Sequence, residues 1–366
     1  MKAMLVLANG MVFEGKNFGA QGTRVGEVVF NTGMVGYEET LTDPSYYGQI
    51  ITAAYPLVGN YGVNGEDAES SRIWAFGYIV REACETPSNF RCKKTLDAFL
   101  KEQNIIGLEG IDTRRLVRVL REAGVMNGAL TTEYETAEAA LADEKLMESI
   151  RSYAVTEAVK SVTTGEPEVF NEDGSYRVAL FDFGCKRNIV RCLVKRGCRV
   201  AVVPAETTAD QLKDMDLDGI MLSNGPGDPA ENVQIIENLR DIAKMGLPIF
   251  GICLGHQLMA LAQGAETEKL KYGHRGVNQP VTDLAHGRTY ITSQNHGYAV
   301  VGGSVDASVA EISAVNANDN TVEGLRYKNF DCFTVQFHPE ACGGPRDTEY
   351  LFDEFIAMMA KRKGEA

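Results

Sequence analysis

Short apolar runs alternate with helical patterns through the second half of the chain. Runs at 178–183, 199–203, 219–222 and 247–252 are accompanied by helical patterns at 186–196, 233–245 and 254–263. This alternation predicts a parallel sheet with right-handed crossover helices. The carboxyl ends of such strands meet at one edge, where we expect the functional site. Residues 281–340 are rich in strand-forming patterns, and 348–359 predict a closing amphipathic helix.

The first part of the chain has a different pattern. Strand-like runs at 3–7, 12–14, 27–30 and 73–80 precede helical patterns such as 112–120, which ends near Gly124. This predicts a mixed α+β domain over 1–154. The first apolar run stops at the turn signal Asn9-Gly10, which indicates a hairpin and not a signal peptide. The polar, Gly/Pro-punctuated stretch 155–176 is typical of a linker, so the second domain is predicted at 177–366.

Composition narrows the range of partners. The net charge of −14 over 366 residues would repel a phosphate backbone or an anionic membrane, so we expect no nucleic acid and no membrane partner. No apolar stretch is long enough to span a bilayer. The eight cysteines form no CxxC pair, which argues against a disulfide framework or a metal site. We therefore expect a soluble, cytoplasmic protein with no bound metal.

One cysteine lies in a distinctive setting. The pentapeptide Gly251-Ile252-Cys253-Leu254-Gly255 follows an apolar run and precedes a helical pattern. This arrangement is typical of a nucleophile elbow, where a strained turn presents the nucleophile and glycines allow close approach of neighbouring main chain. A helix N-terminus favours the thiolate, and the Leu254 N–H is placed to donate to an oxyanion.

A histidine and a carboxylate end a later strand-like run, in His338-Pro339-Glu340. Because residues i and i+2 of a strand share a face, His338 and Glu340 can touch. Glu340 would fix the tautomer while His338 takes a proton from Cys253 and later delivers one to a leaving amine. A lone cysteine or histidine is more often structural, and it is the combination that predicts thiol-based acyl transfer.

A glycine-rich loop, 223–229, follows another predicted strand and should open on the same edge as Cys253. No Gly-Lys-Ser/Thr follows it, so it is not a phosphate-binding P-loop. It is either a tight turn or, through the Gly227 N–H, a second oxyanion donor. The segment 294–298 is a predicted hairpin tip that can equally be structural or bind a ligand.

Together these segments resemble the class I glutamine amidotransferases, and more narrowly the small, glutamine-hydrolysing subunit of carbamoyl phosphate synthetase. Segments 30–39, 41–50, 107–114, 182–188 and 293–297 are similar to that family, and the first two resemble an N-terminal signature that other amidotransferases of the class lack. The resemblance implies that Cys253 attacks the glutamine side-chain amide, His338 is base and then acid, and Glu340 orients His338. It implies a glutamine pocket made by Ser45, Gly225, Gly227, Leu254, Gln257, Asn295, Gly297 and Tyr298.

The fold that the resemblance implies is a mixed α+β N-terminal domain that docks a large synthetase subunit, followed by a doubly wound, mostly parallel-sheet amidotransferase domain. Ammonia would pass through a sheltered tunnel to the large subunit, where ATP and magnesium are expected; no cofactor is expected on this chain. Three positions depart from the family pattern: Gln279, Tyr298 and the loop 341–345. The alternatives are another class I amidotransferase subunit, a catalytically silent regulatory subunit, or a thiol hydrolase that acts alone.

Overall fold

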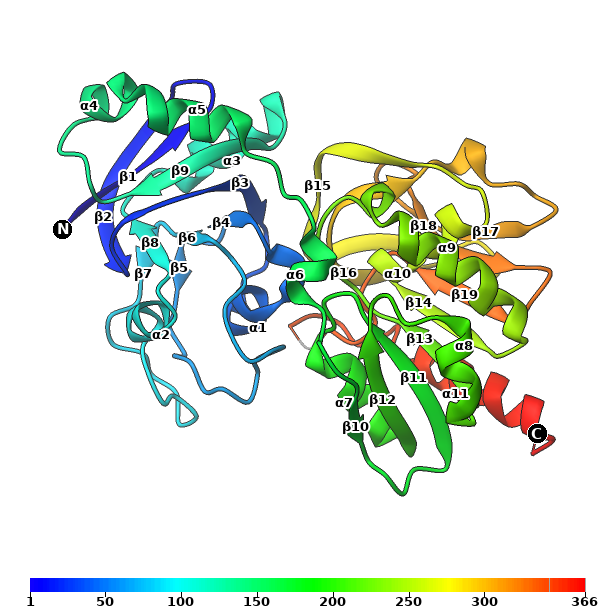
Figure 1. Cartoon of the computed structure of the whole chain (residues 1–366). Coiled ribbons are helices and arrows are strands. Elements are labelled where there is room, and N and C mark those ends of the chain that lie inside the picture. Colours follow the sequence, from blue (N-terminus) through cyan, green and yellow to red (C-terminus); the bar gives the residue numbers. More distant parts are fainter. Residues whose placement is uncertain (342, 366) are drawn as a thin grey trace. The chain divides into compact units, whose positions relative to one another are not determined.

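The computed structural model describes residues 1–341 and 343–365, so Cys342 lies outside the described residues. The chain divides into two compact units, Met1–Thr156 and Glu157–Ala366 (Figure 1). The first is a mixed α+β unit and the second an α/β unit, which confirms the predicted fold class.

The first unit is built around a closed barrel with the strand order β1-β2-β8-β6-β4-β3-β9. The strands are β1 (Lys2–Leu7), β2 (Val12–Gly19), β3 (Thr23–Asn31), β4 (Gln49–Ala53), β6 (Gly77–Ile79), β8 (Ile106–Glu109) and β9 (Met126–Thr131), with β5 (Leu57–Val58) and β7 (Glu82–Ala83) as a separate pair. Strands β1 and β2 pair antiparallel with Val6 opposite Val12, which confirms the N-terminal hairpin. Of the expected strand 73–80, only Gly77–Ile79 is a strand.

Alternate side chains along the barrel strands face opposite sides of the sheet and pack with different helices. The helices are α1 (Tyr37–Thr42), α2 (Leu96–Glu102), α3 (Thr113–Ala123), α4 (Ala137–Ala142) and α5 (Glu144–Ser152). Along β1, Leu5 and Leu7 join the core shared with α3, while Met4 and Val6 pack with α4 and α5. The predicted ends of α3 are confirmed: the Asp112 carboxylate accepts from the Arg115 N–H at 2.9 Å, and Gly124 ends the helix with φ 96°.

The second unit contains a ten-stranded sheet, in which five adjacent strands, β12-β11-β13-β14-β19, run parallel. Strand β10 and the strands beyond β19 pair antiparallel. In spatial order the strands are β10 (Glu168–Phe170), β12 (Cys198–Pro204), β11 (Tyr176–Asp182), β13 (Gly219–Leu222), β14 (Ile249–Ile252), β19 (Cys332–Val335), β18 (Val322–Tyr327), β17 (Ala310–Asn316), β15 (Thr267–Asp283) and β16 (Arg288–Val300).

Helices pack on both faces of the parallel strands, so this part is doubly wound (Figure 1). Helices α8 (Ala209–Leu212), α9 (Val233–Ile242) and α10 (Leu254–Ala262) bury side chains against one face. Helices α7 (Arg187–Lys195) and α11 (Tyr350–Lys363) do so against the other. Strand β11 shows why: Ala179 and Phe181 belong to the first core, while Val178 and Leu180 belong to the second.

The stretch expected as a linker, 155–176, has regular structure. It contains helix α6 (Ala158–Val162), and β10 pairs antiparallel with β12. Val159 is 2 % exposed and belongs to the core of the second unit. The Gly/Pro punctuation therefore marks turns between short elements and not a free connection, because each element buries apolar side chains on the sheet.

Among the described residues, no helix is long and apolar enough to cross a bilayer.

Candidate active site

Cys253 lies between β14 and α10 in a backbone conformation that non-glycine residues rarely adopt, with φ 53° and ψ −103°. A Cβ on Gly251 would lie 2.8 Å from Thr334 Cγ2, and one on Gly255 would lie 2.6 Å from the Leu222 carbonyl oxygen. Both positions therefore need glycine. The strand, strained turn and helix have the geometry of a nucleophile elbow, as the pentapeptide predicted.

Strands β14, β19 and β16 bring Cys253 and His338 to the same edge of the sheet. The Cys253 N–H donates to the Val335 carbonyl at 2.8 Å, and its thiol lies 3.7 Å from the Asn295 carbonyl oxygen. The His338 N–H donates to the Ser293 carbonyl at 2.9 Å. Since residues two apart on a strand are separated by about 7 Å, β16 holds the thiol and the histidine in one small region.

His338 and Glu340 form a buried hydrogen-bonded pair. His338 Nδ1 lies 2.7 Å from Glu340 Oε1, and both side chains are 0 % exposed. The His338 Nε2 atom is buried and has no hydrogen-bond partner among the described residues. A buried nitrogen without a partner calls for an explanation, and a base that waits for a proton provides one. With Nδ1 donating to the carboxylate, Nε2 is the basic nitrogen.

Two other buried histidines near Cys253 are poorer bases. His256 lies on α10 with Nδ1 2.8 Å from Thr334 Oγ1, and burial lowers its pKa to about 3. His296 has Nδ1 2.7 Å from the Tyr298 carbonyl and Nε2 3.1 Å from Gln294 Oε1, and burial lowers its pKa. His338 combines a buried, unpartnered Nε2 with a carboxylate hydrogen-bonded to Nδ1. Among the described residues His274 has a similar arrangement, with Nε2 2.8 Å from Asp319 and no hydrogen bond to Nδ1, but its Nδ1 lies 3.7 Å from a second carboxylate, Glu323.

Lys186 is a member of this site to which the sequence analysis gave no role. Its Nζ lies 3.2 Å from Glu340 Oε1, and its side chain is 9 % exposed. Burial alone would raise the pKa of Glu340, but the charges of His338 and Lys186 and the hydrogen bond from His338 lower it to about 2. Lys186 directly precedes α7, just beyond β11. The signal that could have identified it was its place after a parallel strand, at the edge expected to hold the site.

Replacing Lys186 with methionine should destabilise the protein by about 3 kcal/mol at neutral pH, since it leaves a buried carboxylate with one charged partner fewer. The folded-state pKa of Glu340 is depressed, so its contribution is present above the ordinary value of 4.5 and is lost as the pH falls toward about 2. The difference in unfolding free energy between wild type and variant should therefore shrink as the pH falls through this window. Urea unfolding at several pH values measures it.

Lys195→Met is the matched control. Lys195 is the last residue of α7, the helix that Lys186 precedes; its Nζ is 3.2 Å from Glu349, but its side chain is 69 % exposed. An exposed pair contributes about 1 kcal/mol or less. If the two methionine variants lose the same free energy of unfolding at neutral pH, the buried Lys186–Glu340 pair contributes no more to stability than the exposed Lys195–Glu349 pair.

The glycine-rich loop lies directly beside the elbow. The Gly255 N–H donates to the Ser223 carbonyl at 3.0 Å, and a Cβ on Gly225 would lie 2.7 Å from Leu254 Cδ2. Gly227 has φ 88°, a conformation that favours glycine. Asn224 joins the loop to the segment that follows β11. Its Nδ2 donates to the Gly184 carbonyl at 2.9 Å, and its Oδ1 accepts from the Lys186 N–H at 3.1 Å.

The predicted glutamine-pocket residues of the second unit fall on three neighbouring segments: the glycine-rich loop, the start of α10, and β16. Gln257 Nε2 donates to the Tyr298 carbonyl at 2.7 Å and to Gln336 Oε1 at 2.8 Å, which ties α10 to β16. Asn295 contacts the thiol of Cys253 through its carbonyl, and Gly297 lies between Asn295 and Tyr298 on the same strand. Ser45 belongs to the first unit, where its N–H donates to Asp43 Oδ1 at 2.9 Å. Its role in the pocket stays a prediction.

A second polar cluster lies next to β16. One ligand atom from each of His274, His296 and Glu323 lies within 4.8 Å of the others. The Glu323 carboxylate accepts from Gln294 at 2.9 Å and from Asn316 at 3.2 Å. Hydrogen bonds thus engage both oxygens of Glu323 and both ring nitrogens of His296, while His274 Nδ1 has no hydrogen bond and lies 3.7 Å from Glu323 Oε1. We interpret the cluster as a network that holds the 294–298 segment in place.

Comparison with known proteins agrees with this geometry over both units. Residues 5–130 match the family described as "Carbamoyl-phosphate synthase small chain, CPSase domain", and residues 179–358 match "Glutamine amidotransferase class-I". The carbamoyl phosphate synthase small chain of Clostridium perfringens is 49% identical over 97% of this chain and 99% of its own length.

Two further relatives with the same name are as similar. The Bacillus cereus (strain ATCC 10987) protein is 51% identical over 100% of this chain and 98% of its own length. The Listeria monocytogenes protein is 51% identical over 100% of this chain and 99% of its own length. Relatives that match from end to end at this identity leave no doubt about the family. The chain belongs to the carbamoyl phosphate synthase small chains and carries the glutamine-hydrolysing, class I glutamine amidotransferase domain of that family.

Proposed function

We propose that Cys253, His338 and Glu340 carry out the glutamine hydrolysis of this family through a thioester. The observation that supports the proposal most strongly is the buried His338–Glu340 pair in the turn after β19, together with a cysteine held with φ 53° at the end of the neighbouring strand β14. A nucleophile, a base and an orienting carboxylate are the components that acyl transfer requires.

In the first step, His338 Nε2 takes the thiol proton and the sulfur attacks the side-chain amide carbon of glutamine. The N–H groups of Leu254 and Gly227 stabilise the negative charge on the oxygen. Leu254 is the first residue of α10, so its N–H has no partner within the helix. The protonated His338, stabilised by Glu340, then gives its proton to the departing nitrogen, which leaves as ammonia.

In the second step, His338 takes a proton from water, and the resulting hydroxide attacks the thioester. The carbon–sulfur bond then breaks, glutamate is released with its side chain as a carboxylic acid, and His338 returns its proton to the Cys253 sulfur. The α-ammonium and α-carboxylate of glutamine would be recognised by main-chain groups and amide side chains, chiefly of Gly225, Gln257, Asn295, Gly297 and Tyr298, together with Ser45. Such groups select a zwitterion without placing a net charge in the pocket.

The ammonia would pass to a large synthetase subunit that makes carbamoyl phosphate from bicarbonate and ATP. This is the partner that a small chain implies, and we expect ATP and magnesium to bind there and no cofactor to bind this chain. The first unit, which supplies only Ser45 to the proposed pocket, would be the docking platform. The net charge of −14 speaks against nucleic acid as a further partner.

We predict that the isolated chain is a poor glutaminase and that its rate rises by about 100-fold when the large subunit is bound and is turning over ATP. Small displacements of reacting groups can change a rate by this factor, and docking would complete the alignment of Cys253, His338 and the oxyanion donors. Steady-state ammonia release should be compared for the chain alone, for the complex, and for the complex with ATP and bicarbonate.

Equal rates under the three conditions would contradict coupling and favour a hydrolase that acts alone. Co-purification of the two chains provides a separate check on partner binding. If the two chains form a complex but the rate does not rise, the large subunit is confirmed as a partner. The claim that docking aligns the reacting groups would then be contradicted.

A further inference from the structure

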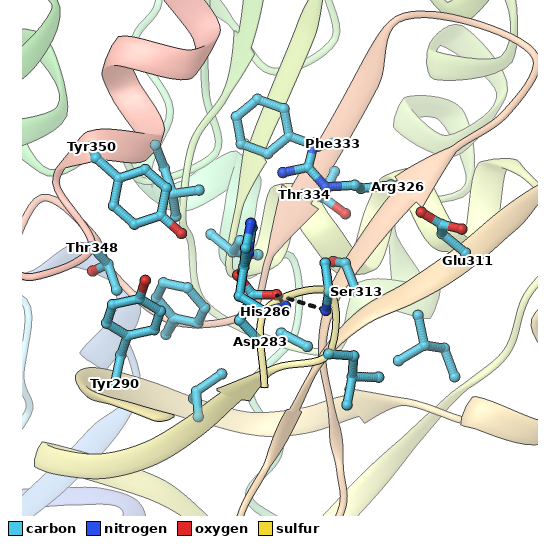
Figure 2. A pocket seen from close by; sticks show the side chains of 18 residues that line it. Asp283, His286, Tyr290, Glu311, Ser313, Arg326, Phe333, Thr334, Thr348 and Tyr350 are labelled. Atoms are coloured by element: carbon cyan, nitrogen blue, oxygen red, sulfur yellow. Dashed lines mark hydrogen bonds and ion pairs between the residues drawn. The ribbon is translucent and has the colours of Figure 1, made fainter. Parts of the chain in front are cut away.

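A cavity of about 430 Å³ lies in the second unit (Figure 2). It is bounded by the turn between β15 and β16, by β17, β18 and β19, and by the start of α11. Its volume is in the range of small-ligand pockets, about 300–1,000 Å³. The described residues that line it include none of those assigned above to the catalytic triad or the glutamine pocket.

The floor of the cavity is apolar and its side is aromatic. The floor residues, each 5 % exposed or less, are Val281, Phe333, Val335, Phe337 and Leu351. The rings of Tyr290 and Tyr350 lie with centroids 6.1 Å apart at 43° on one side, with Arg326 and Glu311 on the other in the view of Figure 2. Buried phenylalanines below and two tyrosine rings beside them suit a flat aromatic ring.

The charges at the rim select the sign of the ligand. Arg326 is already neutralised, because its guanidinium donates to both oxygens of Glu354 at 2.5 and 3.0 Å. Asp283 accepts from the turn that contains His286. The Glu311 carboxylate lies opposite Arg326 across the β17–β18 pair yet has no hydrogen bond or ion pair among the described residues. Arg288 lies over the Tyr290 ring at 4.9 Å and is the register partner of Asp283, so the charges of Asp283 and Arg288 offset each other. Glu311 is then the acidic group at the rim that favours a cation over a phosphate or carboxylate.

Strand β19 connects the cavity to the catalytic edge. Phe333 and Val335 on β19, and Phe337 just beyond its end, line the cavity. The chain neighbours of Phe337 contact the proposed site: Gln336 accepts from Gln257, and His338 binds Glu340. Phe337 is thus the direct neighbour of the proposed base. A ring that pushes on Phe337 would shift the backbone that positions His338.

We propose that this cavity is a regulatory site for a small aromatic amine, and that its occupancy changes the rate of glutamine hydrolysis through Phe337 and His338. The ring occupies the apolar floor beside Tyr290 and Tyr350, and the ammonium group faces Glu311. Because the amine and glutamine bind at separate places, the amine should change kcat and should not compete with glutamine.

Tyramine is a suitable probe, and 3-(4-hydroxyphenyl)propionate is its matched control, with the same ring and the opposite charge. Calorimetric titration of the full chain should give a dissociation constant of about 1 mM or tighter for tyramine and weaker binding of the carboxylate. Glutaminase kinetics with saturating tyramine should show a changed kcat. The titration does not depend on activity, so a failure of this proposal is distinguishable from a failure of the catalytic assignment.

Two variants test the location. Ala314→Leu places a larger side chain in the cavity lining and should weaken tyramine binding by at least about tenfold, since the added carbon atoms would take up space that the ring needs. Ala317→Leu makes the same change at an exposed position outside the cavity and should leave binding unchanged. Glu311→Gln at the exposed rim should weaken tyramine by about threefold, the size of an exposed ion pair, and keeps the test valid if Ala314→Leu does not fold.

Tyramine binding with the expected response to these variants and a changed kcat would support the proposal. It is overturned if tyramine binds no better than the carboxylate, if neither Ala314→Leu nor Glu311→Gln weakens binding, or if saturation leaves kcat unchanged. A purely competitive pattern against glutamine would also overturn it, since that would place the probe in the glutamine pocket.

Discussion

Replacing Cys253 with serine is expected to reduce glutamine hydrolysis by about 1,000-fold or more. An alcohol is a far weaker nucleophile than a thiolate at neutral pH, and the proposed role of the His338–Glu340 pair is to take the proton of the Cys253 thiol. Steady-state glutamate release measures the loss. With the large subunit present, synthesis driven by added ammonia should continue, because that chemistry does not use this thiol.

Cys192→Ser is the matched control, since Cys192 lies on α7 of the same unit and has no proposed role in the reaction. It should retain near-native hydrolysis. Near-native activity of Cys253→Ser would show that the elbow does not carry the nucleophile. Loss of ammonia-driven synthesis in the same variant would point instead to damage of the fold or of subunit docking.

The second large effect is expected at His338. His338→Asn should lower kcat by about 1,000-fold or more, because the variant lacks the group that moves both protons. Glu340→Gln should cost less, by about 100-fold, since the amide can keep a hydrogen bond to the ring but supplies no charge for the imidazolium. The pKa of Glu340 is about 2, so in the wild type the carboxylate is ionised across any practical assay range.

Comparison of kcat for the two variants under saturating glutamine tests this order. A loss in Glu340→Gln that equals or exceeds the loss in His338→Asn would contradict it and would give the carboxylate a direct part in the reaction. Thermal unfolding of both variants is needed alongside, because both side chains are fully buried.

Local patterns in the sequence were sufficient for much of this protein. Strand β13 has the predicted bounds, Gly219–Leu222, and α10 begins at Leu254 as predicted, because continuous apolar runs and helical periodicity report directly on burial in a parallel sheet. The residues 251–255 predicted the strained turn, since two glycines around a cysteine between a strand and a helix suit little else. The pair His338 and Glu340 was predicted to touch from the i, i+2 spacing of a strand. The structure confirms the contact, but β19 ends at Val335 and the two residues lie in the turn that follows it.

Where local patterns failed, the deciding contacts were with distant parts of the chain. The stretch 155–176 was predicted to be a linker because its composition is polar, yet β10 is a strand, since β12 offers it a free edge to pair with. Only part of 73–80 is a strand, because the neighbours β4 and β8 pair with just three of its residues.

The sequence by itself determined the local conformation of the nucleophile, the contact between His338 and Glu340, and the edge of the sheet where both belong, because each depends on residues a few positions apart. Only the tertiary structure decided which other groups reach that edge. Lys186 is far from Glu340 in the chain, and their ion pair exists because β11 and β19 end at the same side of one sheet. The cavity beside β19 likewise arises from five separate segments, and no pattern within any one of them encodes it.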